Sequence, residues 1–133
     1  MNPVVGVFEG GDGSGKSTQR CLLVAWLVEQ GIDVVATREP GGTEVGLALR
    51  GMLLDGDHVS ARSEALLMAA DRAQHVAEMI RPALARGAWV VRDRHVPSSL
   101  VYQGVVRGLG VDAIAALSAF ATDGLVPDVV VVL

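Results

Sequence analysis

Short apolar runs along the chain alternate with longer stretches in which apolar residues recur every three or four positions. The short runs are rich in Val and Ile, and they end at glycines, turns or charged residues. A continuous β-branched run predicts a strand buried on both faces, whereas the wider spacing predicts one apolar face of a helix. The pattern predicts strands at 4–8, 32–37, 89–91 and 128–133, and helices at 17–30, 43–54, 63–84, 97–103 and 112–122.

Individual residues refine where these helices begin, bend or pack. The side-chain oxygens of Thr43 and Asp112 can accept hydrogen bonds from the free N–H groups of a first helical turn, so both are predicted helix caps. Pro82 lacks an N–H group and should kink or interrupt the 63–84 helix near its end. Cys21 lies among apolar residues of the first helix, where we expect a small core side chain.

Strands that alternate with helices predict an α/β fold, in which helices cover both faces of a parallel sheet. At 133 residues the chain is long enough for one domain, 1–133, and short for two. Ligands of such folds bind outside the carboxyl ends of the strands. The candidate polar segments 10–17, 38–39 and 93–94 each follow a predicted strand directly. We therefore expect them to converge on one crevice.

Composition narrows the classes of partner. A formal net charge of -4 argues against general binding of nucleic acid, which requires clustered positive charge. No apolar run approaches the roughly 18 residues that span a membrane, and the chain begins without a signal-peptide pattern. We therefore expect a soluble cytoplasmic protein without a membrane or nucleic-acid partner. Of the 11 basic residues only Lys16 is a lysine, and it lies in a glycine-rich loop.

The glycine-rich loop fits the P-loop pattern G-x-x-x-x-G-K-S/T, which binds the phosphates of nucleoside triphosphates. Glycines let backbone N–H groups turn toward phosphate oxygens, and the helix that follows offers the positive end of its dipole. Lys16 can bridge the β- and γ-phosphate oxygens, and Ser17 can hold Mg2+. The predicted ATP-binding residues are Gly10, Gly11, Asp12, Gly13, Ser14, Gly15, Lys16, Ser17 and Thr18.

A charged pair at the end of the third predicted strand adds catalytic candidates. Asp93 can orient the Mg2+ shell and Arg94 can clamp a phosphoryl group during transfer, although a structural ion pair is the alternative interpretation. The three histidines lack metal-ligand spacing. An acceptor that is already an ionised phosphate needs no general base. Lys16, Asp93 and Arg94 are therefore the predicted catalytic residues. Ser17 and Asp93 are the predicted metal ligands.

Several short blocks in a fixed order resemble bacterial thymidylate kinase, a nucleoside monophosphate kinase with a P-loop fold. They extend from the P-loop to the start of the last predicted strand, so the resemblance covers essentially the whole chain. The blocks are EGGDGSGKST at 9–18, TREPGGT at 37–43, DRAQH at 71–75, DRH at 93–95, SS at 98–99, YQG at 102–104 and PD at 127–128.

The resemblance implies transfer of the ATP γ-phosphoryl group to dTMP, which gives dTDP and ADP, with Mg2+ as the essential ion. Carried over by position, Arg38, Arg50 and Arg94 would face the acceptor phosphate. Asp12 would lie near the deoxyribose 3'-hydroxyl, and Tyr102 would line the sugar pocket, where its ring can exclude a 2'-hydroxyl.

The resemblance assigns the base to a second group of residues. Arg72 would hydrogen-bond the thymine edge, with Ser99 and Gln103 helping to read the base. Family members usually place a phenylalanine at the position of Met68, where the ring stacks on thymine. Because methionine offers no ring face, we expect weaker stacking with retained pyrimidine binding. A cis peptide is expected at the 39–40 bond.

The remaining expectations concern the catalytic arginine, the lid and the dimer of the family. Gly13 stands where some members have an arginine, and this chain resembles the type that supplies the arginine from a mobile lid. The lid, the adenine-binding segment and the final helices would lie beyond Leu133, so we expect an incomplete kinase domain with little catalysis of its own. The resemblance also implies a homodimer. A kinase for another nucleoside monophosphate and a catalytically silent nucleotide-binding module stay open as alternatives.

Overall fold

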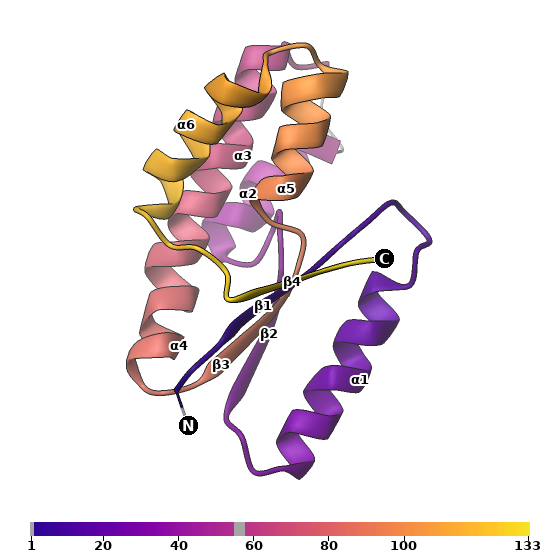
Figure 1. Ribbon diagram of the computed structural model, residues 1–133. Helices are drawn as coiled ribbons and strands as arrows, with labels where there is room; N and C mark the ends of the chain where they lie inside the picture. Colours follow the sequence, from indigo (N-terminus) through magenta and orange to yellow (C-terminus); the bar gives the residue numbers. More distant parts are fainter. Residues whose placement is uncertain (1, 55–57) are drawn as a thin grey trace.

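A four-stranded parallel sheet forms the centre of the molecule (Figure 1). The computed structural model describes residues 2–54 and 58–133. The strands are β1 (Val5–Glu9), β2 (Val34–Arg38), β3 (Trp89–Asp93) and β4 (Val129–Val132), in the order β2-β3-β1-β4. The helices are α1 (Lys16–Glu29), α2 (Glu44–Leu54), α3 (Ala61–His75), α4 (Arg81–Ala85), α5 (Val96–Ser99) and α6 (Val111–Thr122), with π-helical segments η1 (Val76–Ile80) and η2 (Leu100–Val106). The predicted α/β class is confirmed.

Helices cover both faces of the sheet, with α1 on one side and the consecutive helical segments α3, η1 and α4 on the other (Figure 1). Val90 of β3 packs in a core with Ile80 of η1, whereas its neighbour Val91 packs with Leu27 of α1. Successive side chains of a strand point to opposite faces, so one short valine-rich strand serves two cores. This double burial explains why a continuous apolar run, without alternation, predicts the strand correctly.

Two predictions of burial are wrong. The last strand, β4, lies at the edge of the sheet beside β1, and its four valines are exposed. Cys21 is exposed as well, because α1 turns Leu27 toward the sheet and Cys21 away from it. An apolar sequence indicates that a strand or a helix face favours burial. Whether that face is buried depends on another element that packs against it.

The starts of two helices give one confirmation and one correction. Thr43 Oγ1 accepts a hydrogen bond from the Gly46 N–H at 2.9 Å, which confirms the predicted cap of α2. Asp112 is not a cap, because α6 begins at Val111 and the residue before the helix is Gly110. Gly110 adopts φ 94°, a conformation that suits glycine. Asp112 lies in the first turn instead, where a carboxylate still favours the positive end of the helix dipole.

Two predicted helices contain π-helical turns. The predicted 63–84 helix is observed as α3, η1 and α4, and Pro82 lies in the first turn of α4. Proline cannot donate a helical hydrogen bond, so the wider turn just before it fits the predicted interruption. The predicted 97–103 helix is observed as α5 followed by η2.

None of the described helices is both long enough and apolar enough to cross a membrane.

Candidate functional site

The three polar segments predicted to converge lie together at the carboxyl ends of β1, β2 and β3. Asp93 is the register partner of Arg38 on one side and of Phe8 on the other. Beyond the strands, the Glu39 N–H donates to the Asp93 carbonyl at 3.1 Å, and the Arg94 N–H donates to the Phe8 carbonyl at 2.9 Å. The sheet register therefore holds the loops after these strands side by side.

The P-loop connects β1 to α1. Gly13 and Gly15 adopt φ angles of 77° and 95°, a left-handed backbone that side chains disfavour, and Gly15 immediately precedes the helix. The side chain of Lys16 is buried, and its Nζ donates to the Gly11 carbonyl at 2.8 Å. Gly10, Gly11 and Ser14 belong to the same loop. A cavity of about 430 Å³ opens over it and is lined by Asp12, Gly13, Gly15, Lys16, Ser17, Thr18, Asp93 and Arg94.

The two predicted metal ligands meet at the edge of this cavity. Ser17 Oγ donates a hydrogen bond to Asp93 Oδ2 at 3.3 Å. Asp93 Oδ1 is buried and has no hydrogen-bond partner among the described residues. Within residues 2–54 and 58–133, no cluster of three or more His, Cys, Asp and Glu side chains could hold a metal ion by itself. The pair offers a partial shell of hard oxygen ligands, which suits a cation that keeps phosphate and water as its other ligands.

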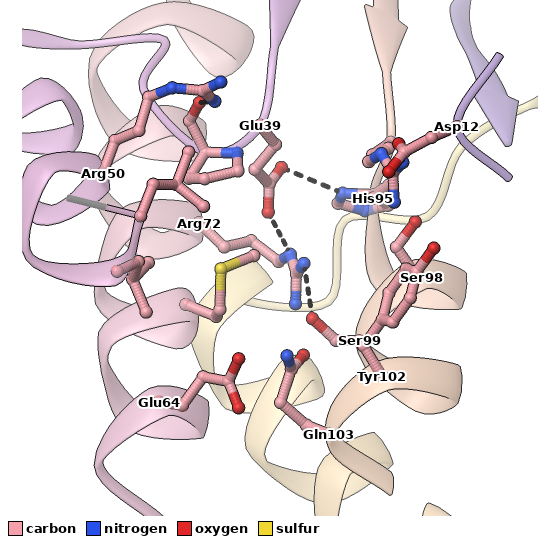
Figure 2. A pocket seen from close by; sticks show the side chains of 15 residues that line it. Asp12, Glu39, Arg50, Glu64, Arg72, His95, Ser98, Ser99, Tyr102 and Gln103 are labelled. Carbon is pink, nitrogen blue, oxygen red and sulfur yellow. Dashed lines mark hydrogen bonds and ion pairs between the residues drawn. The ribbon is translucent and has the colours of Figure 1, made fainter. Parts of the chain in front are cut away.

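A second cavity, of about 420 Å³, lies beside the first and shares Asp12 and Arg94 with it. Figure 2 shows its lining, which comes from the P-loop, the turn after β2, α2, α3, the loop after β3, α5 and η2. Of the predicted substrate-binding residues, all but Arg38 line this cavity: Asp12, Arg50, Met68, Arg72, Arg94, Ser99, Tyr102 and Gln103. Arg38 is exposed at the end of β2. The further lining residues are Glu39, Pro40, Leu53, Leu54, Glu64, His95 and Ser98.

The inner end of this second cavity presents one fixed donor and one free acceptor. The buried Arg72 donates from Nη2 to Ser99 Oγ at 3.0 Å and from Nη1 to Ser118 Oγ at 3.3 Å. Gln103 is 5% exposed, and its Oε1 has no hydrogen-bond partner in the described part of the chain. A buried amide oxygen without a partner is costly in a folded protein, so this end is complementary to a ligand that supplies a donor.

The outer end carries cations. Arg94 Nη2 lies 2.5 Å from Asp12 Oδ1, and the Arg94 guanidinium lies 5.4 Å from the centre of the Tyr102 ring. Arg50 Nη1 donates to the Pro40 carbonyl at 2.8 Å, which holds that side chain against the turn after β2. The expected cis peptide is present between Glu39 and Pro40. The second cavity is therefore polar and cationic at the end that adjoins the P-loop.

A family model for thymidylate kinase matches residues 8–133. The chain belongs to the thymidylate kinase family. The thymidylate kinase of Clavibacter michiganensis subsp. michiganensis is 52% identical over 134 residues, which cover 98% of this chain and 64% of the relative. That of Bifidobacterium longum is 53% identical over 133 residues, which cover 96% of this chain and 65% of the relative.

A solved structure in the thymidylate kinase family has the same fold. The crystal structure of thymidylate kinase from Ehrlichia chaffeensis matches with a TM-score of 0.94 at 36% sequence identity, covering 99% of this chain and 76% of that chain. The present chain thus spans a little under two thirds of the length of the two relatives above. The predicted fold of the nucleoside monophosphate kinase type is confirmed.

Sequence reasoning missed a buried ionic cluster in the wall of the second cavity of this thymidylate kinase family member. Glu39 forms ion pairs with Arg72 and Arg92, and the ring Nδ1 atoms of His75 and His95 each lie 3.6 Å from Glu39 Oε2. All five side chains are buried. Arg92 is the one sequence signal, because a charged residue inside a valine-rich strand needs a partner.

Burial changes the acid–base properties of this cluster. Burial lowers the pKa of Arg72 to about 10 and that of Arg92 to about 9, so both guanidiniums stay charged near neutral pH. Burial, followed by the neighbouring positive charges, lowers the pKa of His95 to about 2. Burial also lowers the pKa of His75. Both imidazoles are therefore neutral members of the cluster.

Two further carboxylates fix the loops around the site. Glu9 accepts hydrogen bonds from the His95 N–H at 2.7 Å and from Ser98 Oγ at 2.5 Å, which ties the end of β1 to the start of α5. Asp71 Oδ1 accepts from the Gly41 N–H at 3.0 Å and ties α3 to the turn after β2. These contacts hold the elements that carry the lining residues.

Proposed function

We propose that this protein transfers the γ-phosphoryl group of ATP to dTMP, giving dTDP and ADP. The observation that carries the proposal is the pair of adjoining cavities that share Asp12 and Arg94. A triphosphate over the P-loop and a monophosphate in the second cavity would bring donor and acceptor phosphates together at those two residues. Membership of the thymidylate kinase family supports the same reaction.

The inner end of the second cavity fits thymine. Arg72 would donate to the O4 carbonyl, and the unpartnered Oε1 of Gln103 would accept the N3–H. Ser99 would keep Arg72 in place, and Met68 would contribute apolar contact to the base. Cytosine has an acceptor at N3 and an amino group at C4, so it would leave both protein groups unpaired. The proposal therefore predicts preference for thymine and uracil over cytosine.

The outer end fits the acceptor phosphate and the sugar. Arg50 and Arg94 line it and would bind the phosphate of dTMP, with Asp12 near the 3'-hydroxyl and Tyr102 against the sugar. Arg38 stays a prediction, because its side chain is exposed and does not line the cavity. Bringing an ionised phosphate into line with the donor is mainly a matter of position and charge neutralisation, so no general base is required.

The donor would occupy the P-loop cavity, formed by residues 10–18. The backbone N–H groups of the loop would surround the phosphates, and Lys16 would exchange its contact with the Gly11 carbonyl for the β- and γ-phosphate oxygens. Ser17 and Asp93 fit Mg2+, because both offer oxygen atoms and Asp93 Oδ1 has no hydrogen-bond partner in the described residues. Bound there with ATP, Mg2+ would neutralise charge on the transferring phosphate.

We also propose that the protein acts as a homodimer in the cytoplasm. Apolar side chains are exposed along α3, η2 and α6, among them Leu66, Val105 and Phe120. Between α3 and α6 a groove of about 260 Å³ is lined mostly by apolar residues. Burying such a surface against a second copy would remove apolar area from water. Sedimentation equilibrium at two concentrations measures the mass directly, and a monomer at both would refute the dimer.

The proposed reaction is tested by incubating the purified protein with ATP, Mg2+ and one of dTMP, dUMP, CMP or AMP. From a protein of the relatives' length we expect dTDP and ADP in equal amounts, with less product from dUMP and the least from CMP and AMP; the 133 residues alone should turn over little of any substrate. Intact mass is measured on the same preparation, so that turnover is assigned to a chain of known length.

Each other outcome of that assay points to a different conclusion. Preferential turnover of CMP or AMP would refute the assignment of Arg72 and Gln103 to thymine. In a protein whose intact mass matches the length of its relatives, binding of ATP without turnover of any monophosphate would identify a nucleotide-binding module instead of a kinase.

A further inference from the structure

Glu39 occupies a junction between the sheet and the inner end of the second cavity. Its backbone N–H is bonded to the Asp93 carbonyl at 3.1 Å, so its position is set by the register of β2 and β3. It is 3% exposed and lines the cavity wall, where Arg72 Nε lies 2.5 Å from its Oε1 (Figure 2). Arg92 pairs with Oε2 from the neighbouring strand. One carboxylate therefore contacts two buried guanidiniums.

We propose that Glu39 is a positioning residue for base recognition: its carboxylate holds Arg72 by Nε, so that both Nη groups stay turned toward Ser99, Ser118 and the cavity. This inference rests on the proposed function, because it assigns Arg72 to the base of the acceptor. Glu39 acts through Arg72 and need not touch the substrate.

The contacts of Arg72 give the physical reason. Its guanidinium has a neighbour on three edges: Glu39 forms an ion pair at Nε, and Ser118 and Ser99 accept hydrogen bonds from Nη1 and Nη2. The two serines are neutral acceptors that either Nη group could share or exchange. Only the contact with Glu39 involves the Nε edge, so this contact determines which edge of the guanidinium faces away from the two serines. A planar donor whose orientation is fixed before the ligand arrives loses less conformational entropy on binding.

The other side chains near Arg72 and Arg92 do not form this ion pair. Among the described residues it is the only carboxylate within ion-pair distance of Arg72 or Arg92. His75 and His95 are also close to its carboxylate, but both are neutral and cannot replace its charge. The charges of Asp71 and Glu9 also favour the charged form of Arg72 and so raise its pKa, but neither carboxylate lies within ion-pair distance of Arg72 or Arg92, and Asp71 Oδ1 is engaged by the Gly41 N–H. Without the Glu39 charge, the two guanidiniums would repel each other in a buried site.

The test is the Glu39→Gln variant, which keeps the shape of the side chain and removes its charge. We expect the dissociation constant for dTMP, measured by calorimetry, to rise by about tenfold or more, because a buried charge pair loses one partner. In turnover assays the KM for dTMP should rise while kcat changes little, since the phosphoryl group is transferred at the other end of the cavity. Asp33→Asn is the matched control, because it removes the exposed ion pair with Arg86 and should leave dTMP binding unchanged.

A double-mutant cycle with Arg72→Met separates positioning from general support of the fold. If Glu39 acts through Arg72, Glu39→Gln adds little to the loss already caused by Arg72→Met. Fully additive losses would overturn the proposal. Should Glu39→Gln fail to fold, Glu39→Asp keeps the charge but withdraws it by one methylene. That variant should still weaken dTMP binding, and unchanged binding would overturn the proposal too.

A spectroscopic readout keeps the proposal separate from the proposed function. The Arg72 Nε–H should give a slowly exchanging signal in the 15N spectrum of the wild-type protein, and Glu39→Gln should shift it and speed its exchange. If the wild type binds no dTMP, the proposed function fails while this signal still reports whether Glu39 holds Arg72. If the wild type binds dTMP but the signal is unaffected by Glu39→Gln, the positioning role is refuted.

Discussion

Arg94 Nη2 lies 2.5 Å from Asp12 Oδ1, and this ion pair joins the loop after β3 to the P-loop. The two residues are also the ones that both cavities share. Arg94 has a positive φ of 66°, unusual for a residue with a long side chain, and the Tyr102 ring lies beneath its guanidinium. The backbone, the ring and the carboxylate together hold the Arg94 cation at the boundary between the proposed donor and acceptor sites.

This placement predicts that Arg94→Lys lowers kcat strongly. Lysine keeps the charge but loses the fork that can contact the P-loop and a phosphate at once, so we expect kcat to fall on the order of a hundredfold. The KM for dTMP should rise less, because Arg50 would still contact the phosphate. Steady-state kinetics with dTMP as the varied substrate provide the measurement, and Arg86→Lys, at an exposed ion pair, is the control. An unchanged kcat would remove Arg94 from the transfer step.

A second prediction concerns the only lysine. Lys16 Nζ is bonded to the Gly11 carbonyl, so it is held in the loop and can reach a bound triphosphate without a large movement. Lys16→Ala should lower kcat/KM for ATP by a hundredfold or more, on the order expected for removing a cation from a transferring phosphate. Binding of dTMP, followed by calorimetry, should stay within about twofold of wild type. Loss of dTMP binding instead would show that Lys16 supports the second cavity.

The sequence predicts the elements and most of the residues that line the two cavities, for a specific reason. The P-loop, Arg72 and Asp93 each lie next to a strand or on a helix whose apolar pattern is clear, and strand ends of a parallel sheet meet at one edge. The cluster around Glu39 was not predictable in this way, because it depends on the register that sets Arg38 opposite Asp93. The exposure of β4 was missed because four consecutive valines indicate only that the strand favours burial.

Met68 gives a prediction about base affinity. It lines the second cavity on α3, where an aromatic ring could lie against the face of a pyrimidine. Met68→Phe should tighten dTMP binding by about 0.5–1.5 kcal/mol, roughly twofold to tenfold, because stacking adds to apolar contact. Calorimetry with dTMP measures the change, and Leu66→Phe, at an exposed position on the same helix, is the control. Unchanged or weaker binding would show that Met68 packs only within the protein.

The neutral histidines predict how stability depends on pH. His95 has a pKa of about 2 in the folded protein, against 6.5 for an unperturbed imidazole. Between these two pH values the unfolded chain binds a proton that the folded protein excludes. The free energy of unfolding therefore rises with pH through this window, and stability is lost as pH falls below about 6.5. His75, whose pKa is also lowered, acts in the same direction over its own window.

Urea unfolding between pH 7.5 and 5 measures this dependence. His95 alone should contribute up to about 1.4 kcal/mol of unfolding free energy for each pH unit below 6. Asp71 opposes the trend at the acid end, because burial raises its pKa and the folded state then takes up the proton first. The His95→Asn variant should show a shallower slope than wild type, whatever its absolute stability, because the asparagine takes up no proton. Equal slopes for wild type and His95→Asn would mean that His95 titrates alike in the folded and unfolded states, which is incompatible with its burial between Arg72 and Arg92.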